Sequence, residues 1–551
     1  MADVEQRTED WKSLPWKEYQ RNVFRLQKRI YQAERRGDRK RVHNLQRLLL
    51  RSWSARCLAV RQVSQDNRGK RTPGVDGIAS LTPKQRLTYA RRLTDLSQKT
   101  DPVRRVYIPK MNNPHEQRPL GIPTMYDRAR QALVKLALEP EWEARFEPNS
   151  YGFRPGRCPQ DAIEAIFNFI RLKPKYALDA DIEKCFDRID HQALVCKLKA
   201  ISPISRLVKA WLKAGVVDHG ETLFPETGAP QGGVASPLLA NVALHGLEEY
   251  LVKVCPHPNK PGVIRFADDF VILHEDWETL LVLWHKTDAW LAEMGLKLKP
   301  SKTHIRHTLT EYDGKIGFDF LGFTIRQFPV GKYHTRTYRG KPGFKTIIKP
   351  SEKAQRRRLL QIREVIYKHR GNAQAALISE LNPIIRGWAN YYHTCTAKKV
   401  FDQMDTQVYF KLVKWADYRH HRHKSPGWRY RRYWRRIRGR VAFSDGTTTL
   451  IKHGNTKVRR HVKVMGDKSP FDGDWLYWSA RLGRDPTKPN RVVKALKRQD
   501  GKCAYCGLRF MAEDVLETHH RDGNHANHAF SNLVILHGHC HDWIHAAAAC
   551  P

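Results

Sequence analysis

Two adjacent acidic residues inside an apolar stretch constrain the fold of this 551-residue chain more than any other feature. The stretch reads Val-Ile-Arg-Phe-Ala-Asp-Asp-Phe-Val-Ile-Leu over residues 263–273, which predicts two buried strands joined at Asp268 and Asp269. Neighbouring carboxylates repel each other and are poor strand formers, so an apolar flank on both sides makes this a costly position. A divalent cation offsets the cost, because carboxylate oxygens are the ligands that Mg²⁺ prefers. An isolated pair would instead fit the solvated tip of a hairpin.

The surrounding pattern predicts several domains. A second apolar strand, Tyr-Ala-Leu-Asp-Ala-Asp-Ile at residues 176–182, also ends on carboxylates. Strand-like and helical segments alternate from about Pro102 to Arg326, which is typical of an α/β domain. Basic helical patterns lie on either side, over Trp16–Val63 and Glu352–Arg422.

The charge indicates the class of partner. Lys and Arg total 98 against 56 Asp and Glu, a formal net charge of +42. A chain this basic usually binds a polyanion. Charge alone names no reaction, because ribosomal and nucleoid-packing proteins share it.

Cysteine usage and the apolar pattern favour the cytoplasm. Three of the ten cysteines, Cys503, Cys506 and Cys540, fall in one histidine-rich stretch, which in a reducing compartment indicates metal binding. The polar, acidic start of the chain is unlike a signal peptide. No apolar run reaches the roughly 18 residues of a membrane span, so we expect no membrane partner.

Seven short motifs stand in one order around the acidic residues, and the set resembles the reverse transcriptases of group II intron-encoded proteins. They span some 220 residues. In chain order they are Arg118–Pro123, Tyr151–Pro155, Asp181–Asp187, Ala229–Gly233, Phe266–Asp269, Leu298–Lys302 and Phe320–Phe323.

The resemblance implies an RNA-directed DNA polymerase. Asp181, Asp268 and Asp269 would hold two Mg²⁺ ions, which activate the primer 3′-hydroxyl and neutralise the leaving pyrophosphate. Phe186 would exclude a ribose 2′-hydroxyl and so select dNTPs. The other residues expected at the nucleotide are Lys110, Arg118, Ile182, Gln231 and Lys302.

Two motifs leave their roles open. Asp187 is either catalytic or only fixes the turn after its strand. Tyr151, Gly152 and Arg154 either contact the template strand or form a tight turn.

A basic, aromatic region follows the polymerase motifs. Leu381–Tyr392 resembles the thumb, or maturase region, of the same family. Lys411–Arg440 holds twelve Lys or Arg residues against one acid, with aromatic residues between them. This composition suits RNA, although a solvated basic helix with aromatic residues in the core would look similar. The predicted contacts to intron RNA are Arg386, Trp388, Tyr391, Lys411, Lys414, Arg431 and Arg432.

The C-terminal stretch has zinc-ligand spacing. Cys503 and Cys506 form one pair, and Cys540 follows two histidines, His537 and His539. Soft ligands in two such pairs suit a structural Zn²⁺ ion. The family commonly has cysteine at the position of His537. We predict His537 as the fourth ligand, with His539 as the open alternative.

The same stretch resembles the HNH, or ββα-metal, endonucleases. This implies His520 as the general base and Asn532 as the residue that braces its loop. His519 and His541 would hold one Mg²⁺ or similar ion, with His545 as a third ligand. The competing interpretation is an inactive zinc knuckle that only binds DNA.

We therefore expect a multidomain α/β protein with a right-hand polymerase fold. Its parts would be a helical N-terminal extension (1–80), fingers and palm (81–345), an all-helical thumb that binds RNA (346–440), a basic DNA-binding domain (441–485) and an HNH module with zinc (486–551). The expected partners are a group II intron RNA, double-stranded target DNA and dNTPs. The alternatives are a reverse transcriptase repurposed for host repair or defence, and an RNA-binding splicing factor with a vestigial active site.

Overall fold

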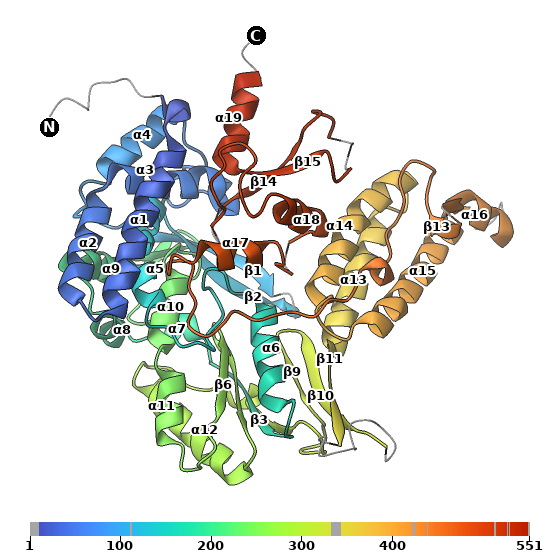
Figure 1. The fold of residues 1–551 in the computed structure, drawn as a ribbon, viewed down its shortest axis with the longest axis horizontal. Coiled ribbons are helices and arrows are strands. Elements are labelled where there is room, and N and C mark those ends of the chain that lie inside the picture. Colours follow the sequence, from blue (N-terminus) through green and yellow to red (C-terminus); the bar gives the residue numbers. More distant parts are fainter. Residues whose placement is uncertain are drawn as a thin grey trace.

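Four helices form the N-terminal part of the computed structural model (Figure 1). The structure describes residues 10–110, 113–331, 343–420, 425–437, 439–486, 488–511, 514–525, 527 and 529–548. The four helices are α1 (Trp16–Arg35), α2 (Arg39–Arg51), α3 (Trp53–Arg61) and α4 (Pro83–Arg92). In α2 the buried residues Val42, Leu45 and Leu49 recur at helical spacing with basic residues between them. This stripe packs the helices on α5 (Met125–Glu143) and confirms the helical prediction.

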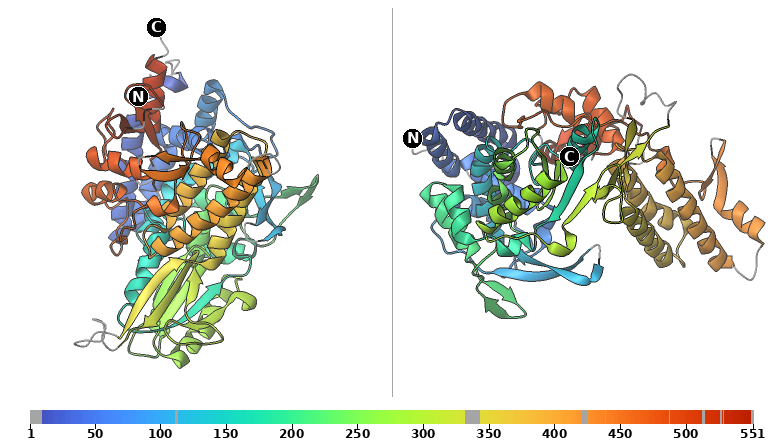
Figure 2. Two further views of the ribbon diagram at one scale, coloured as in Figure 1. Left: turned by 90° about the vertical axis from the view of Figure 1, so that its right-hand side faces the viewer. Right: turned by 90° about the horizontal axis from the view of Figure 1, so that it is seen from below.

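The first sheet follows the N-terminal helices. Its strand order is β2-β1-β4-β5, with β1 (Val103–Lys110), β2 (Asn113–Ile122), β4 (Val216–Asp218) and β5 (Glu221–Leu223). The view from below in Figure 2 shows the long β1–β2 ribbon as a projection separate from the thumb helices. The β1–β2 ribbon belongs to the part of the chain for which the fingers were predicted.

The second sheet contains both acidic strands and forms the palm. Its order is β6-β7-β3-β8, with β3 (Tyr176–Asp181), β6 (Gly262–Phe266), β7 (Asp269–His274) and β8 (His304–His307). Residues 270–273 of β7 are all fully buried, because helices and a third sheet cover the strand. Burial on both faces accounts for the continuous apolar run in the sequence.

Helices surround the palm sheet, and a third sheet connects it to the thumb. The helices are α6 (Pro159–Ile170), α7 (Cys185–Arg188), α8 (His191–Leu198), α9 (Ser202–Leu212), α10 (Ser236–Leu244), α11 (Leu247–Val254) and α12 (Trp277–Ala292). The third sheet has the order β11-β10-β9, with β9 (Phe318–Phe320), β10 (Phe323–Pro329) and β11 (Phe344–Pro350).

The thumb has its own hydrophobic core. Three long helices, α13 (Glu352–Lys368), α14 (Gln374–Tyr392) and α15 (Lys398–His420), precede the short α16 (Pro426–Tyr433). A hairpin of β12 (Trp434–Ile437) and β13 (Arg440–Phe443) places Trp434 and Phe443 in the same core. The sequence had predicted an all-helical thumb, and the hairpin shows that this prediction was wrong. Local basic composition hid the hairpin, whose inward residues are aromatic.

Residues 444–474, called here the strap, do not form the separate domain predicted for 441–485. Among the described residues the strap has no core of its own. It crosses from the thumb to the N-terminal helices (Figure 1), where Phe471 packs with Phe24 and Tyr31. Midway, His461 Nε2 lies 2.9 Å from Asp161 Oδ1 of α6, and the backbone of Val464 donates to the same oxygen.

The C-terminal module comprises residues 475–548. Its elements are α17 (Trp475–Leu482), α18 (Asn490–Arg498), β14 (Leu516–His520), β15 (Leu533–His537) and α19 (Gly538–Ala548). Leu482 of α17 belongs to the core of the module, so this core starts before the predicted boundary at residue 486. The strand pair and the helix after it form a ββα unit. No helix in the described part of the chain is long and apolar enough to cross a membrane.

Candidate functional site

The palm sheet brings the three predicted carboxylates to one end. Asp181 of β3 lies directly opposite Asp269 of β7. Phe266 pairs with Asp269, so Ala267 and Asp268 form a two-residue hairpin loop beside them. Ala267 has φ 59°, the conformation that this position of a type II′ turn requires and that usually selects glycine. Asp181, Asp268 and Asp269 thus form one acidic group at the end of the palm.

The acidic group carries excess negative charge. Desolvation by the surrounding palm raises the pKa of Asp269 to about 7, and the charges of Asp268 and Asp181 add to the shift. The pKa of Asp268 is also raised by burial and by Asp181. Lys302 makes an ion pair with Asp181. One ammonium group does not balance three carboxylates, so the donor set fits Mg²⁺, the metal that reverse transcriptases generally use.

Most of the predicted nucleotide-binding residues lie around the acidic group. The ring of Phe186 is half-buried and meets Phe153 edge to face, with centroids 6.3 Å apart. Arg118 is exposed on β2, and its positive charge opposes part of the rise in the pKa of both Asp268 and Asp269. The backbone of Gly121 in β2 donates to the Gln231 carbonyl over 2.6 Å, which ties the Gln231 loop to the fingers.

For two predicted nucleotide contacts, at Ile182 and Lys110, the structure describes no side chain that is available at the site. The Ile182 side chain is buried in the core, so only its backbone is available to a nucleotide. The side chain of Lys110 lies outside the described residues. Asp187 is exposed in α7, while its backbone carbonyl accepts from Thr227.

A buried network holds the hairpin that carries Asp268. A Cβ atom on Gly152 would lie 2.2 Å from the Ala267 nitrogen, so only glycine fits beneath the hairpin. The Asn241 amide donates to the Gly152 carbonyl over 2.8 Å. The Arg265 guanidinium donates to Asn241 Oδ1 and to the Ala267 carbonyl. Sequence reasoning missed Asn241 and Arg265, although a buried arginine beside the acids was a signal.

Arg154 has a structural position. Its guanidinium makes two parallel bonds to the Glu143 carboxylate, at 2.8 and 3.0 Å. It also donates to the carbonyls of Glu147 and Ser150. Only 1% of either side chain in the ion pair is exposed. Of the two interpretations of the Tyr151–Pro155 motif, this geometry favours the tight turn for Arg154 and the buried Tyr151.

We expect Glu143→Gln to destabilise the palm by about 3–5 kcal/mol, because it leaves the Arg154 charge buried without its partner. Urea denaturation followed by circular dichroism measures the change. Glu352→Gln is the matched control: its carboxylate pairs with Arg356 at 3.4 Å on the surface, and its loss should cost less than about 1 kcal/mol. Equal effects of the two substitutions would contradict a buried structural role for the pair.

The predicted RNA-binding residues divide between surface and core. Arg386, Lys414, Arg431 and Arg432 are exposed and Lys411 is half-exposed. Trp388 is 4% exposed and packs on Tyr392 and Phe401, so the prediction of direct RNA contact by this ring was wrong. Tyr391 stacks on Phe323, and its hydroxyl donates to Leu321. Both aromatic residues hold the thumb on the third sheet.

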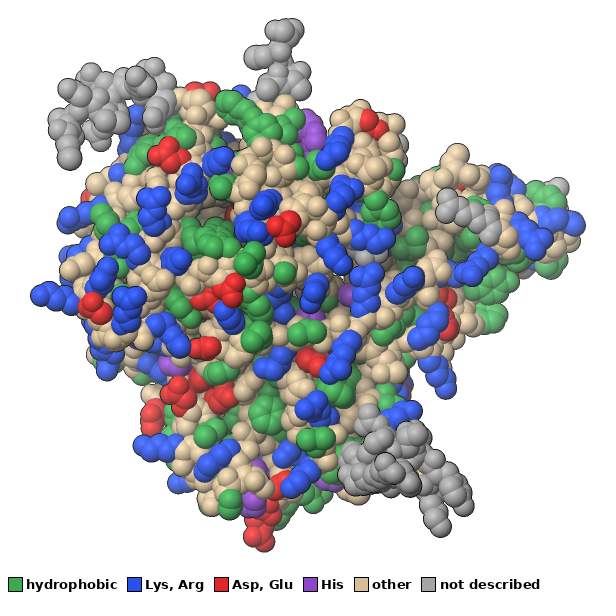
Figure 3. All heavy atoms as spheres, in the orientation of Figure 1, with side chains coloured by type: hydrophobic (Ala, Val, Ile, Leu, Met, Phe, Trp, Pro, Cys, Tyr) green, Lys and Arg blue, Asp and Glu red, His purple; other side chains and the backbone are tan. Residues whose placement is uncertain are grey.

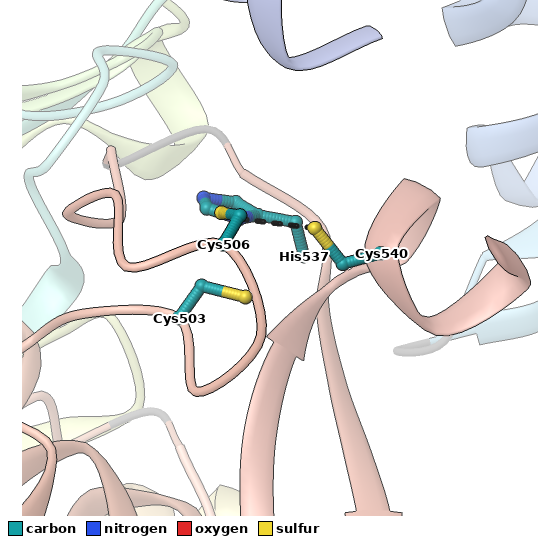
Figure 4. A group of neighbouring side chains, drawn as sticks. All are labelled: Cys503, Cys506, His537 and Cys540. Carbon is teal, nitrogen blue, oxygen red and sulfur yellow. Dashed lines mark hydrogen bonds between the residues drawn. The ribbon is translucent and has the colours of Figure 1, made fainter. Parts of the chain in front are cut away.

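Four soft ligands meet in the C-terminal module. The ligand atoms of Cys503, Cys506, His537 and Cys540 all lie within 4.8 Å of one another. Figure 4 shows them converging from the loop at 503–506 and from the junction of β15 and α19. His537 Nδ1 faces Cys506 Sγ at 3.3 Å, while its Nε2 lies 3.3 Å from Asp514. This donor set fits a tetrahedral Zn²⁺ ion and selects His537 rather than His539.

A second histidine group lies on the ββα unit. The ring nitrogens of His519, His541 and His545 all lie within 4.8 Å of one another. His541 and His545 face each other from successive turns of α19, with their Nε2 atoms 3.1 Å apart. Burial and the neighbouring rings lower the pKa of His519 and His541, which favours neutral imidazoles that can bind a cation.

The predicted base and its loop adjoin this histidine group. His520 follows His519 at the end of β14, and only 9% of it is exposed. The Asn532 amide donates to Asp522 Oδ1 and to the Asn527 carbonyl, and its oxygen accepts from the Asp522 backbone. These bonds close the loop between β14 and β15, and the bracing role of Asn532 in a nuclease stays a prediction.

A third group, Cys158, Asp161 and His461, also has ligand atoms within 4.8 Å. Asp161 is already paired with Arg481 as well as His461. This arrangement favours a structural junction between the palm, the strap and α17 over a metal site.

The chain matches three families, and their order along the chain agrees with the fold. They are the N-terminal domain of reverse transcriptase over residues 11–93, reverse transcriptase (RNA-dependent DNA polymerase) over 108–325, and the group II intron maturase-specific domain over 356–434. The acidic group lies inside the second match. The C-terminal module lies beyond the last one.

Curated relatives point the same way. Protein YkfC of Escherichia coli is 30% identical over 328 residues, which are 52% of this chain and 83% of that protein. The group II intron-encoded protein LtrA of Lactococcus lactis is 33% identical over 216 residues, or 38% of this chain and 36% of that protein. Maturase-like protein 1 of Euglena gracilis is 26% identical over 389 residues, which are 69% of this chain and 77% of that protein. The chain therefore belongs to the group II intron-encoded reverse transcriptases and maturases.

Proposed function

We propose that this protein serves a mobile group II intron in three ways. It binds the intron RNA and assists splicing, cleaves one strand of target DNA, and copies the intron RNA into DNA from the cut strand. The observation that carries this proposal is that one chain holds both the acidic group of the palm and the histidine group of a ββα unit.

The thumb supports an RNA partner. A group II intron maturase implies intron RNA as its ligand, and the thumb presents clustered cations. Burial lowers the pKa of Lys411 on α15, and the positive charges of Arg363 on α13 and of Lys414 lower it further, so like charges lie close together on this face. Phosphate groups offset such repulsion. Lys411, Lys414, Arg431, Arg432 and Arg386 are the residues proposed to bind RNA.

The nuclease proposal depends on the histidine group. His519, His541 and His545 would bind one Mg²⁺ or similar ion, which supplies Lewis acid chemistry at the scissile phosphate. His520 would take the proton from the attacking water. Zn²⁺ at Cys503, Cys506, His537 and Cys540 would hold the loop and α19 that frame this group.

The test is to purify the protein from its native cells and to sequence the RNA that accompanies it. Recovery of one excised intron supports the proposal. A diffuse mixture of cellular RNAs would contradict the proposed role in splicing. It would favour the second candidate, a reverse transcriptase repurposed for repair or defence, whose C-terminal module only targets DNA.

Loss of zinc should unfold the C-terminal module, because structural zinc contributes about 10–16 kcal/mol of apparent binding energy in small zinc domains. Cys503→Ser should remove the zinc and make the module sensitive to limited proteolysis, while primer extension by the palm continues. Metal analysis of the purified protein measures the loss.

Three further variants sharpen the zinc experiment. Cys196→Ser, at an exposed cysteine of α8, is the matched control and should leave the zinc content unchanged. His537→Ala should lose the metal and His539→Ala should keep it. Full zinc content in Cys503→Ser protein would refute the proposed ligand set.

A further inference from the structure

A pocket on the outer side of the palm contains a lysine that none of the sites above uses. The pocket has a volume of about 460 Å³ and lies between α8, the end of α10 and the end of α12. Lys197 of α8 lines it together with Ala193, Trp290 and Met294. In Figure 1, α8 and α12 lie on the side of the palm away from the thumb.

Two contacts hold the Lys197 ammonium beside the pocket. It donates to the Ala243 carbonyl over 2.8 Å, in the last turn of α10, where helix carbonyls lack a partner within the helix. It also lies 4.7 Å from the centre of the Trp290 ring. Because the Lys197 side chain also lines the pocket, a small reagent that enters the pocket meets its amine.

Lys197 is more desolvated than a lysine of the surface. Figure 3 shows Lys and Arg side chains standing out over the face in view, whereas Lys197 is half-buried. Glu147 pairs with His245 at 3.0 Å, and Glu293 is exposed at the pocket. Within the described part of the chain neither carboxylate forms an ion pair with Lys197.

The poorly compensated charge has a chemical consequence. Burial lowers the pKa of Lys197 to about 8, although Glu147 and Glu293 oppose the fall, and the positive charge of Arg265 adds to it. At neutral pH about one Lys197 side chain in ten is therefore an uncharged amine, against on the order of one in 10³ for an unperturbed lysine. A desolvated lysine of this kind is an activated nucleophile.

The pocket also suits the product that such an amine forms with an activated acyl group. The amide nitrogen keeps one N–H, so it can still donate to the Ala243 carbonyl. The acyl group fits in the pocket against the apolar side chains of Trp290 and Met294. The product is uncharged, so the cost of desolvating the ammonium is removed.

We propose that Lys197 is a site of acylation by small acyl phosphates. The uncharged Nζ attacks the carbonyl carbon, and a C–N bond forms while the C–O bond to phosphate breaks. The phosphate leaves with the electrons of that bond and takes up the proton that the nitrogen releases. A small anionic reagent suits this pocket in a chain of net charge +42.

The test treats the full-length protein with acetyl phosphate at neutral pH and follows each lysine by peptide mass spectrometry. Lys253 on α11 and Lys286 on α12 are exposed and serve as references within the same molecule. Acetylation at Lys197 should be about tenfold faster than at either reference, because the larger fraction of free amine outweighs its lower basicity. A rate at Lys197 equal to or below that of the references would overturn the proposal.

The same reaction in urea separates the pocket from the local sequence. Unfolding removes the burial, so the preference for Lys197 should disappear. A preference that persists in the unfolded chain would contradict the role of the pocket.

A pair of variants tests the wall of the pocket. Trp290→Ala opens the pocket to water and should bring the rate at Lys197 down to that of the references. His285→Ala, at an exposed position of the same helix, is the matched control and should keep the tenfold preference. Primer extension by both variants establishes that the palm is folded. An unchanged preference in folded Trp290→Ala protein would refute the assignment of the pocket.

Discussion

Asp268→Asn is expected to abolish DNA synthesis while RNA binding remains intact. The substitution keeps the size of the side chain but removes one of the three negative charges that Asp181, Asp268 and Asp269 offer to Mg²⁺. Metal ions supply several kcal/mol of transition-state stabilisation in phosphoryl transfer, so we expect a loss of at least about 10³-fold in rate. Primer extension on an RNA template measures the activity, and filter binding measures the RNA affinity.

The control for this experiment is Asp319→Asn. Asp319 is an exposed acid of β9 that contributes to the raised pKa of Asp179 but lies outside the acidic group. Its substitution should leave synthesis within a few-fold of wild type. Loss of synthesis and RNA binding together in Asp268→Asn would mean that the aspartate holds the fold. Normal synthesis would remove Asp268 from the catalytic group.

The palm could be predicted from the sequence because apolar residues that favour burial and acids that favour solvent lie side by side there. Residues 263–273 are apolar apart from Arg265 and the two acids, so burial and charge compete within a few positions. Folding resolves the conflict at the hairpin loop, where Asp268 and Asp269 reach solvent while residues 270–273 stay buried. The two acids inside an apolar stretch are therefore a pattern that can be recognised from neighbouring residues alone.

The support of that hairpin was beyond local reasoning. Gly152 and Asn241 come from segments far from residues 263–273, and neither stands out in its own context. Arg265 stands beside the acids, but its contact with Asn241 depends on the fold. Only the close approach of Gly152 to Ala267, where a Cβ would lie 2.2 Å from the nitrogen, shows why this position is glycine. Long-range packing of this kind leaves no periodicity in the sequence.

Aromatic residues among basic ones gave the least reliable signal. Trp388, Trp415 and Trp434 are all buried, because a thumb of three helices and a hairpin needs large side chains in a small core. The basic residues around them remain exposed, together with a few aromatic residues such as Tyr430. Composition describes the thumb as RNA-binding but does not say which side chains contact the RNA.

The choice between His537 and His539 also required the fold. In sequence both lie within three residues of Cys540. In the structure His537 ends β15 and turns Nδ1 to the cysteines because Asp514 holds its Nε2. The ring of His539 stacks on that of His537, outside the ligand group.

His520→Ala is expected to abolish cleavage of target DNA, with a loss of about 10²–10⁴-fold, the usual contribution of a general base. Primer extension should continue, because Asp181, Asp268 and Asp269 lie in a different domain. Zinc content should not change, since His520 is outside the group of Cys503, Cys506, His537 and Cys540. Nicking of labelled target DNA measures the effect, with His285→Ala on the exposed side of α12 as the matched control. Normal nicking by His520→Ala would show that another group takes the proton. Loss of nicking together with zinc would instead place His520 in the structure of the module.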